Sequence, residues 1–224
     1  SGVTGASITS ATGTGATRTV GVNTGTGNGT ILLNVADNDT ILDIAGSQLG
    51  GTGTGNGNYT AGQSYTVDKT VPTVVSINRA NASPTNSATR FFTVTFSESV
   101  TGVDAADFIL TTSGISGATI TSVTGSGTTR SIGVNTGTGD GTIRLDLNDN
   151  DTIVDLASNP IGGAGAQNFI TGQVYTVDKT VPTVVSIVRM NPNPTSLATV
   201  FYTVTFSESV TGVNAGDFVI TRTG

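Results

Sequence analysis

The chain contains no cysteine and no histidine. Without cysteine the fold has no disulfide support and no thiol chemistry. Without histidine the commonest general base and metal ligand is missing. No serine, aspartate or glutamate has a partner arrangement suited to nucleophilic or acid–base catalysis. We therefore expect that the protein is not an enzyme.

Basic residues are also scarce, with 9 Lys and Arg against 15 Asp and Glu and a net charge of −6. Nucleic-acid binding needs a basic footprint, so this class of partner is disfavoured. No apolar run approaches the roughly 18 residues that a membrane helix needs. We expect neither a nucleic-acid partner nor a membrane span in this segment.

Helical patterns of three turns are missing as well, whereas glycine (31 residues) and threonine are abundant. Threonine favours strands, and glycine favours tight turns. The composition therefore predicts an all-β fold with many short strands.

The sequence from Tyr65 to Ile77 returns almost unchanged from Tyr175 to Ile187, 110 residues later. Self-similarity at a fixed long period is typical of an array of repeated modules. We predict one complete module over residues 70–179, the C-terminal part of a preceding module over residues 1–69, and the N-terminal part of a following module over residues 180–224.

This division leaves two interpretations of the flanking pieces. The preferred one is that the sequence is a window cut from a longer repetitive polypeptide. In the other, a subunit completes its split module with the terminus of the next subunit along. Both describe a linear head-to-tail assembly.

Alternation of apolar and polar residues predicts seven strands within the module, labelled A to G. Asp140-Gly141 is a strong hairpin signal and predicts that strands E and F pair. The strands are expected at Val74–Arg79 (A), Arg90–Ser97 (B), Phe108 and Leu110 (C), Ile120 (D), Ile132 and Val134 (E), Ile143 to Leu147 (F) and Tyr175–Asp178 (G).

Seven short strands in about 110 residues indicate an immunoglobulin-like seven-stranded Greek-key β-sandwich, repeated head to tail. The sequence resembles the bacterial immunoglobulin-like repeats found in tandem in very large secreted and surface proteins. The likeness lies in Asp68-Lys-Thr-Val-Pro72, Thr93-Val-Thr-Phe-Ser-Glu-Ser-Val-Thr-Gly-Val103, Asp107-Phe108, and Asp149-Asn-Asp-Thr152 followed by Ala157-Ser-Asn-Pro-Ile-Gly-Gly163. The resemblance implies a scaffolding role in adhesin stalks, fibres or cell-surface layers, and a bacterial extracellular or cell-surface location.

Acidic residues gather at one pole of the predicted module. Antiparallel strands bring the B–C and F–G loops to the end at which the incoming linker arrives, and like charges packed there repel one another. Lys69 and Lys179, in the linkers, cannot neutralise so many carboxylates. Ca²⁺ takes six to eight oxygen ligands, so we predict Ca²⁺ at each joint between modules. The predicted ligands are Asp68, Glu98, Asp104, Asp107, Asp149, Asp151 and Asp155, with Asp37, Asp39 and Asp43 in the preceding copy and Asp178, Glu208 and Asp217 in the following copy.

An alternative is that these residues form ordinary Asx turns and that Glu98 caps a loop backbone. Asn214 stands where the first copy has Asp104, which favours a turn role at that position.

The function expected from these features is a structural repeat protein of an extracellular fibre, sheath or surface filament, in which copies associate head to tail and laterally. The alternative is a stalk or glycan-binding module of a bacterial surface adhesin. Aromatic residues make up only 5% of the chain, and most fall on predicted core positions, which leaves few platforms for stacking against sugars.

Overall fold

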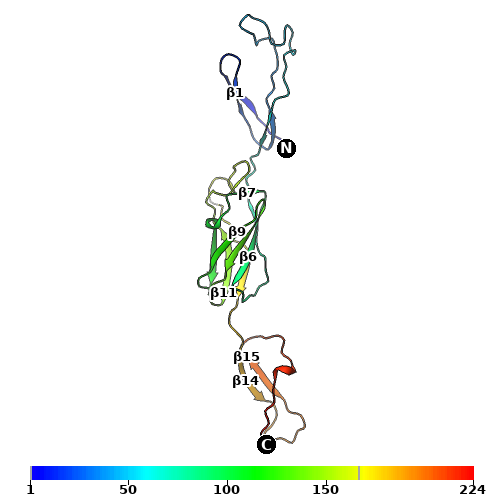
Figure 1. Ribbon diagram of the computed structural model, residues 1–224, viewed down its shortest axis with the longest axis vertical. Helices are drawn as coiled ribbons and strands as arrows, with labels where there is room; N and C mark the ends of the chain where they lie inside the picture. Colours follow the sequence, from blue (N-terminus) through cyan, green and yellow to red (C-terminus); the bar gives the residue numbers. More distant parts are fainter. Residues whose placement is uncertain (1, 166) are drawn as a thin grey trace.

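The computed structural model describes residues 2–165 and 167–224. Figure 1 shows an elongated molecule in which three units follow one another along the long axis. We call them the N-terminal unit (residues 2–69), the central unit (70–179) and the C-terminal unit (180–224). Each sheet of the described residues lies within one unit. The described helical elements are two turns of three residues, and none is long or apolar enough to cross a membrane.

The central unit contains two antiparallel sheets with the strands expected at A to G. One sheet has the order A-B-E-D and the other the order G-F-C. The first consists of β5 (Val74–Arg79), β6 (Thr89–Phe96), β10 (Thr129–Asn135) and β9 (Thr119–Thr124), and the second of β13 (Val174–Val177), β11 (Gly141–Leu147) and β8 (Phe108–Ser113).

Buried side chains from both sheets form one core in the central unit. Alternate residues of β6 point into it, so Phe92, Val94 and Phe96 are buried. The ring of Phe92 meets that of Tyr175 edge-on, with 5.0 Å between ring centroids. Edge-to-face packing is the favoured geometry for aromatic pairs, and here it joins the two sheets.

Two long loops meet at the pole of the central unit nearest the N-terminal unit. The B–C loop (residues 97–107) contains β7 (Val100–Thr101) and the 3₁₀ turn η1 (Ala105–Asp107). The F–G loop (residues 148–165 and 167–173) contains β12 (Val154–Asp155), which pairs with β7. The structure thus confirms that these loops share one pole.

The predicted pairing of strands E and F is wrong. β10 pairs with β6 and β9, and β11 pairs with β13 and β8, so the connection through Asp140-Gly141 passes from one sheet to the other. Its glycines are needed for close approach to the loop between β8 and β9. A Cβ on Gly137 would lie 2.2 Å from the carbonyl oxygen of Ser116, and one on Gly141 would lie 1.9 Å from that of Ser113.

The flanking units repeat the local pairing of the central unit. Gly29 faces Val67 as Gly141 faces Val177, and the irregular pairing of the first two strands recurs in the C-terminal unit. The N-terminal unit holds β1 (Ser7–Thr12), β2 (Thr19–Asn23), β3 (Gly29–Leu32) and β4 (Ser64–Val67), and the C-terminal unit holds β14 (Val184–Arg189), β15 (Tyr202–Phe206) and the 3₁₀ turn η2 (Ala215–Asp217).

Candidate metal site at the joint between units

The linker from β4 to β5 is hydrogen-bonded to the central unit. The carbonyl of Pro72 accepts a bond of 2.7 Å from the amide of Gly162 in the F–G loop. Thr73 and Ser97 exchange two bonds, because each amide donates to an oxygen of the other residue at 2.9 Å. The linker thus enters the central unit along a fixed path.

The other side of the linker is bonded to the N-terminal unit through the turn between β2 and β3. The side-chain oxygen of Asn28 accepts the amide of Lys69 at 2.7 Å, and its side-chain nitrogen donates to the hydroxyl of Thr70. The ammonium of Lys69 donates to the carbonyl of Gly25. This lysine therefore turns back onto the N-terminal unit.

The corresponding turn of the central unit makes the same contacts with the exit linker. Asp140 accepts the amide of Lys179 at 2.5 Å and the hydroxyl of Thr180, and the ammonium of Lys179 donates to Gly137. These bonds lower the pKa of Asp140, the hydroxyl of Thr180 contributing most. Sequence analysis placed Asp140 at a hairpin tip and missed this role, although its position three residues before the end of the repeat period gave no signal for it.

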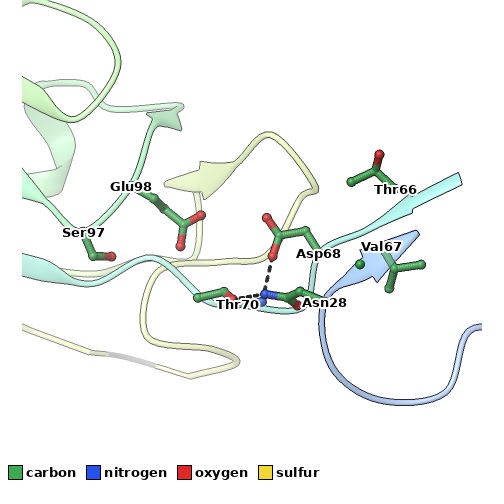
Figure 2. Close-up of a pocket in the computed structure, with 8 residues that line it drawn as sticks. Asn28, Thr66, Val67, Asp68, Thr70, Ser97 and Glu98 are labelled. Carbon is green, nitrogen blue, oxygen red and sulfur yellow. Dashed lines mark hydrogen bonds between the residues drawn. The ribbon is translucent and has the colours of Figure 1, made fainter. Parts of the chain in front are cut away.

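Three of the predicted ligands come together where the linker meets the pole. Asp68, Glu98 and Asp155 each place a carboxylate oxygen within 4.8 Å of the others. They come from the linker, the B–C loop and the F–G loop, as the antiparallel topology requires. Figure 2 shows the carboxylates of Asp68 and Glu98 facing the same space, in an open depression of about 360 Å³.

The carboxylate of Asp155 is held by its own loop. One oxygen accepts the amides of Ala157 and Asn159 at 2.8 Å each, and the other accepts the side-chain nitrogen of Asn159 at 2.8 Å. Burial alone would raise the pKa of Asp155, but the bonds from Asn159 and Ala157 outweigh it and lower the pKa. Asp155 therefore stays ionised beside its two acidic neighbours.

Asn159 also donates a bond of 3.2 Å to the main-chain carbonyl of Asp68. It thus orients Asp155 and ties the F–G loop to the linker at once. Sequence reasoning did not single it out, and Ser47 stands at the matching position of the first copy.

Glu98 lies in the least favourable surroundings of the three. Its Oε1 is shielded from solvent and meets no hydrogen-bond donor among the described residues. Burial raises the pKa of Glu98, and the negative charges of Asp155 and Asp68 raise it further. A carboxylate in this position favours either a proton or a nearby cation.

The other predicted ligands of the central unit serve its loops. Asp104 caps η1 through the amide of Ala106 at 2.7 Å, while Asp107 accepts the amide of Asp104 and the hydroxyl of Thr152. Asp149 accepts the amides of Asp151 and Gln167, and Asp151 has a positive φ of 62° in the turn so formed. The structure does not bring these four into the cluster with Asp68, and it places each in turn or capping geometry.

The predicted ligands of the flanking units show the same division. Asp37 accepts the amides of Asp39 and Gly57 as Asp149 accepts its own pair, and Asp39 accepts Gly53. Asp43 accepts Ala45 and Ser47, whose amides lower its pKa. In the C-terminal unit Asp217 closes the cap of η2, Asp178 accepts the amide of Thr180, and Glu208 repeats Glu98 with a shielded Oε1 that has no donor among the described residues.

The cluster fits the chemistry of a hard divalent cation. Three carboxylates supply oxygen ligands only, as Ca²⁺ requires, and the depression leaves room for further oxygen ligands. Lys69 bonds to Gly25 and does not pair with the cluster. The geometry therefore concentrates negative charge at the joint with no cationic side chain from the linker to offset it.

No family model matches the chain, and no curated protein or solved structure matches it either.

Proposed function

We propose that the chain is a segment of a structural array, in which immunoglobulin-like β-sandwich modules follow one another and Ca²⁺ stiffens each joint. The orders A-B-E-D and G-F-C support the fold, because this is the strand arrangement of constant-type immunoglobulin domains. The resemblance to tandem bacterial repeats agrees with this assignment. The array would serve as an extracellular fibre, sheath or surface filament, with no catalytic role.

The observation that carries the proposal is the joint itself. Its linker is hydrogen-bonded to the units on both sides, and the exit linker repeats the contacts on the one side that can be compared. In repeat proteins, contacts between nearest neighbours transmit order along the array. Pro72 adds stiffness, because its ring fixes φ and restricts the preceding residue.

Ca²⁺ would act at Asp68, Glu98 and Asp155, which join the linker to both loops of the next module. Extracellular sites bind with dissociation constants of roughly 10⁻⁴ to 10⁻³ M. At ~1 mM calcium such a site adds only about 0.4 to 1.4 kcal/mol. Its main effect would be to reduce bending between modules.

Electron microscopy of the protein in calcium tests the structural role. Regular filaments or straight rods with an axial repeat of one or two modules would support it. Globular particles without an axial repeat would contradict it. Reproducible binding on a glycan array, in the absence of filaments, would favour the adhesin alternative.

A further inference from the structure

Apolar residues that are buried in the central unit are exposed at matching positions of both flanking units. Ile77 is 1% exposed and Ile187 is 60% exposed, although the two occupy the same place in the repeat. Likewise Tyr175 is 1% exposed and Tyr65 is 77% exposed. Each flanking unit therefore presents one half of a core.

The two halves differ in which strands they contain. The N-terminal unit has the counterparts of strands D to G, and the C-terminal unit has those of A and B followed by the residues of C. In the N-terminal unit the open half forms a groove of about 980 Å³. Its apolar lining includes Val20, Val22, Ile31, Leu33 and Tyr65.

The strand edges beside the groove are also open. In the central unit β10 pairs on both sides, with β9 and β6, whereas its counterpart β2 pairs only with β1 among the described residues. Similarly, β15 pairs only with β14. An unpaired edge offers a row of backbone donors and acceptors to an added strand.

The C-terminal unit also contains a preformed receptor for a tyrosine hydroxyl. In the central unit the hydroxyl of Tyr175 donates to the carbonyl of Phe91 at 2.7 Å and accepts the amide of Asn81 at 2.9 Å. The side chain of Asn81 accepts the amide of Phe91. Asn191 and Phe201 make this last bond at 2.7 Å. The hydroxyl of Tyr65 has the matching position and meets no partner among the described residues.

We infer that residues 180–224 of one copy of this chain occupy the groove of residues 2–69 in a second copy and complete a two-sheet unit like the central one. The two units lie at opposite ends of an elongated molecule, with the central unit between them, so one copy cannot close on itself (Figure 1). The inference rests on the proposed array for the fold of the completed unit. It names the partner as a second copy of the chain.

The register follows from the central unit. Phe92 faces Ile132 there, so Tyr202 of one copy faces Val20 of the other. Tyr65 enters the receptor formed by Asn191 and Phe201. Repeated addition gives a linear chain of copies.

Sedimentation velocity over a wide concentration range tests this inference with the 224-residue chain. Ile187→Asp disables the C-terminal half, and Tyr65→Asp disables the N-terminal half. Val185→Asp is the matched control, because its counterpart Val75 stays 59% exposed in the central unit. For the other half Ile44→Asp is the control, since its counterpart Leu156 is also exposed.

The unsubstituted chain and both controls are expected to form oligomers whose mass rises with concentration. Each disabled variant alone should stay monomeric. An equimolar mixture of the two should form a dimer and stop there, because each variant retains one working half. A monomeric unsubstituted chain, disabled variants that oligomerise like it, or a mixture without dimer would overturn the inference.

A cysteine pair tests the register in the same chain, which has no cysteine of its own. Ser131 faces Thr93 in the central unit, so Thr19→Cys with Thr203→Cys should give disulfide-linked oligomers on oxidation. The shifted pair Thr19→Cys with Thr205→Cys should give far fewer. Equal yields from both pairs would contradict the register.

Calcium removal separates this inference from the proposed joint site. Complementation depends on apolar burial and strand pairing, so the dimer of the two disabled variants should persist in EGTA. Its loss in EGTA would contradict complementation as described, whereas the calcium site succeeds or fails by calorimetry of the monomeric variants.

Discussion

The carboxylate oxygens of Asp68 and Glu98 lie within 4.8 Å of one another, although one residue belongs to the linker and the other to the B–C loop of the next unit. With Asp155 they concentrate three negative charges where the linker enters the central unit. The ammonium of Lys69 points to Gly25 instead. The joint therefore combines a fixed backbone path with uncompensated charge.

The pKa of Glu98 should respond to calcium. Without the ion it should lie above the ordinary value of 4.5, because burial and two neighbouring carboxylates favour the protonated form. The contribution of Glu98 to joint stability is then fully present below pH 4.5 and is lost as the pH rises through the raised pKa. Carbon-detected NMR titration measures this pKa, and calcium should lower it. The same pKa with and without calcium would argue against an ion at Glu98.

Asp140→Ala should loosen the exit linker, because it removes the acceptor of the Lys179 amide and the Thr180 hydroxyl. NMR relaxation of the amides of residues 179–181 should report faster motion, with little change in the unfolding of the central unit. The depressed pKa of Asp140 predicts the same loosening as the pH falls through it. Thr142→Ala, on the neighbouring strand, serves as the control. Unchanged relaxation in Asp140→Ala would show that the turn does not hold the linker.

Ile77→Ala and Ile187→Ala should differ sharply in their effect on stability. Ile77 is buried in the core, so its truncation should lower the free energy of unfolding of the central unit by about 2 to 5 kcal/mol. Ile187 is exposed in the C-terminal unit, and its truncation should leave the central unit within about 0.5 kcal/mol. Hydrogen exchange of the β10 amides measures both. Similar losses would mean that the two units share one core.

Asp149→Ala should destabilise the F–G loop. It leaves the amides of Asp151 and Gln167 without their acceptor, a loss of about 1 to 3 kcal/mol. Asp178→Ala is the matched control, because Asp178 accepts only one exposed amide, that of Thr180, at 3.2 Å. Denaturant unfolding measures the difference. Equal effects would remove the structural role assigned to Asp149.

Much of the strand pattern could be predicted from the sequence. Alternation in Phe92, Val94 and Phe96 identifies one buried face, and antiparallel topology brings the B–C and F–G loops together. The pairing of E and F could not be predicted, because Asp140-Gly141 has the sequence of a hairpin turn. Its glycines instead allow the turn to pass against the backbone of Ser113 and Ser116.

The acidic residues could be assigned to a pole from the sequence but not to individual roles. Asp104 and Asp149 have the same composition signal as Asp155, yet their oxygens accept backbone amides within their own turns. Such bonds depend on local φ and ψ values. Only the folded linker shows that Asp68 meets Glu98 and Asp155.

Calorimetric titration with Ca²⁺ of the disabled variant Tyr65→Asp tests the joint most directly, because association between copies is then absent. The account predicts binding heat at about one ion per Asp68–Glu98–Asp155 cluster, a higher melting temperature that EGTA reverses, and loss of both on Glu98→Gln but not on Asp104→Asn. No heat and no EGTA-sensitive change in melting temperature, or equal heats from the two substitutions, would contradict it.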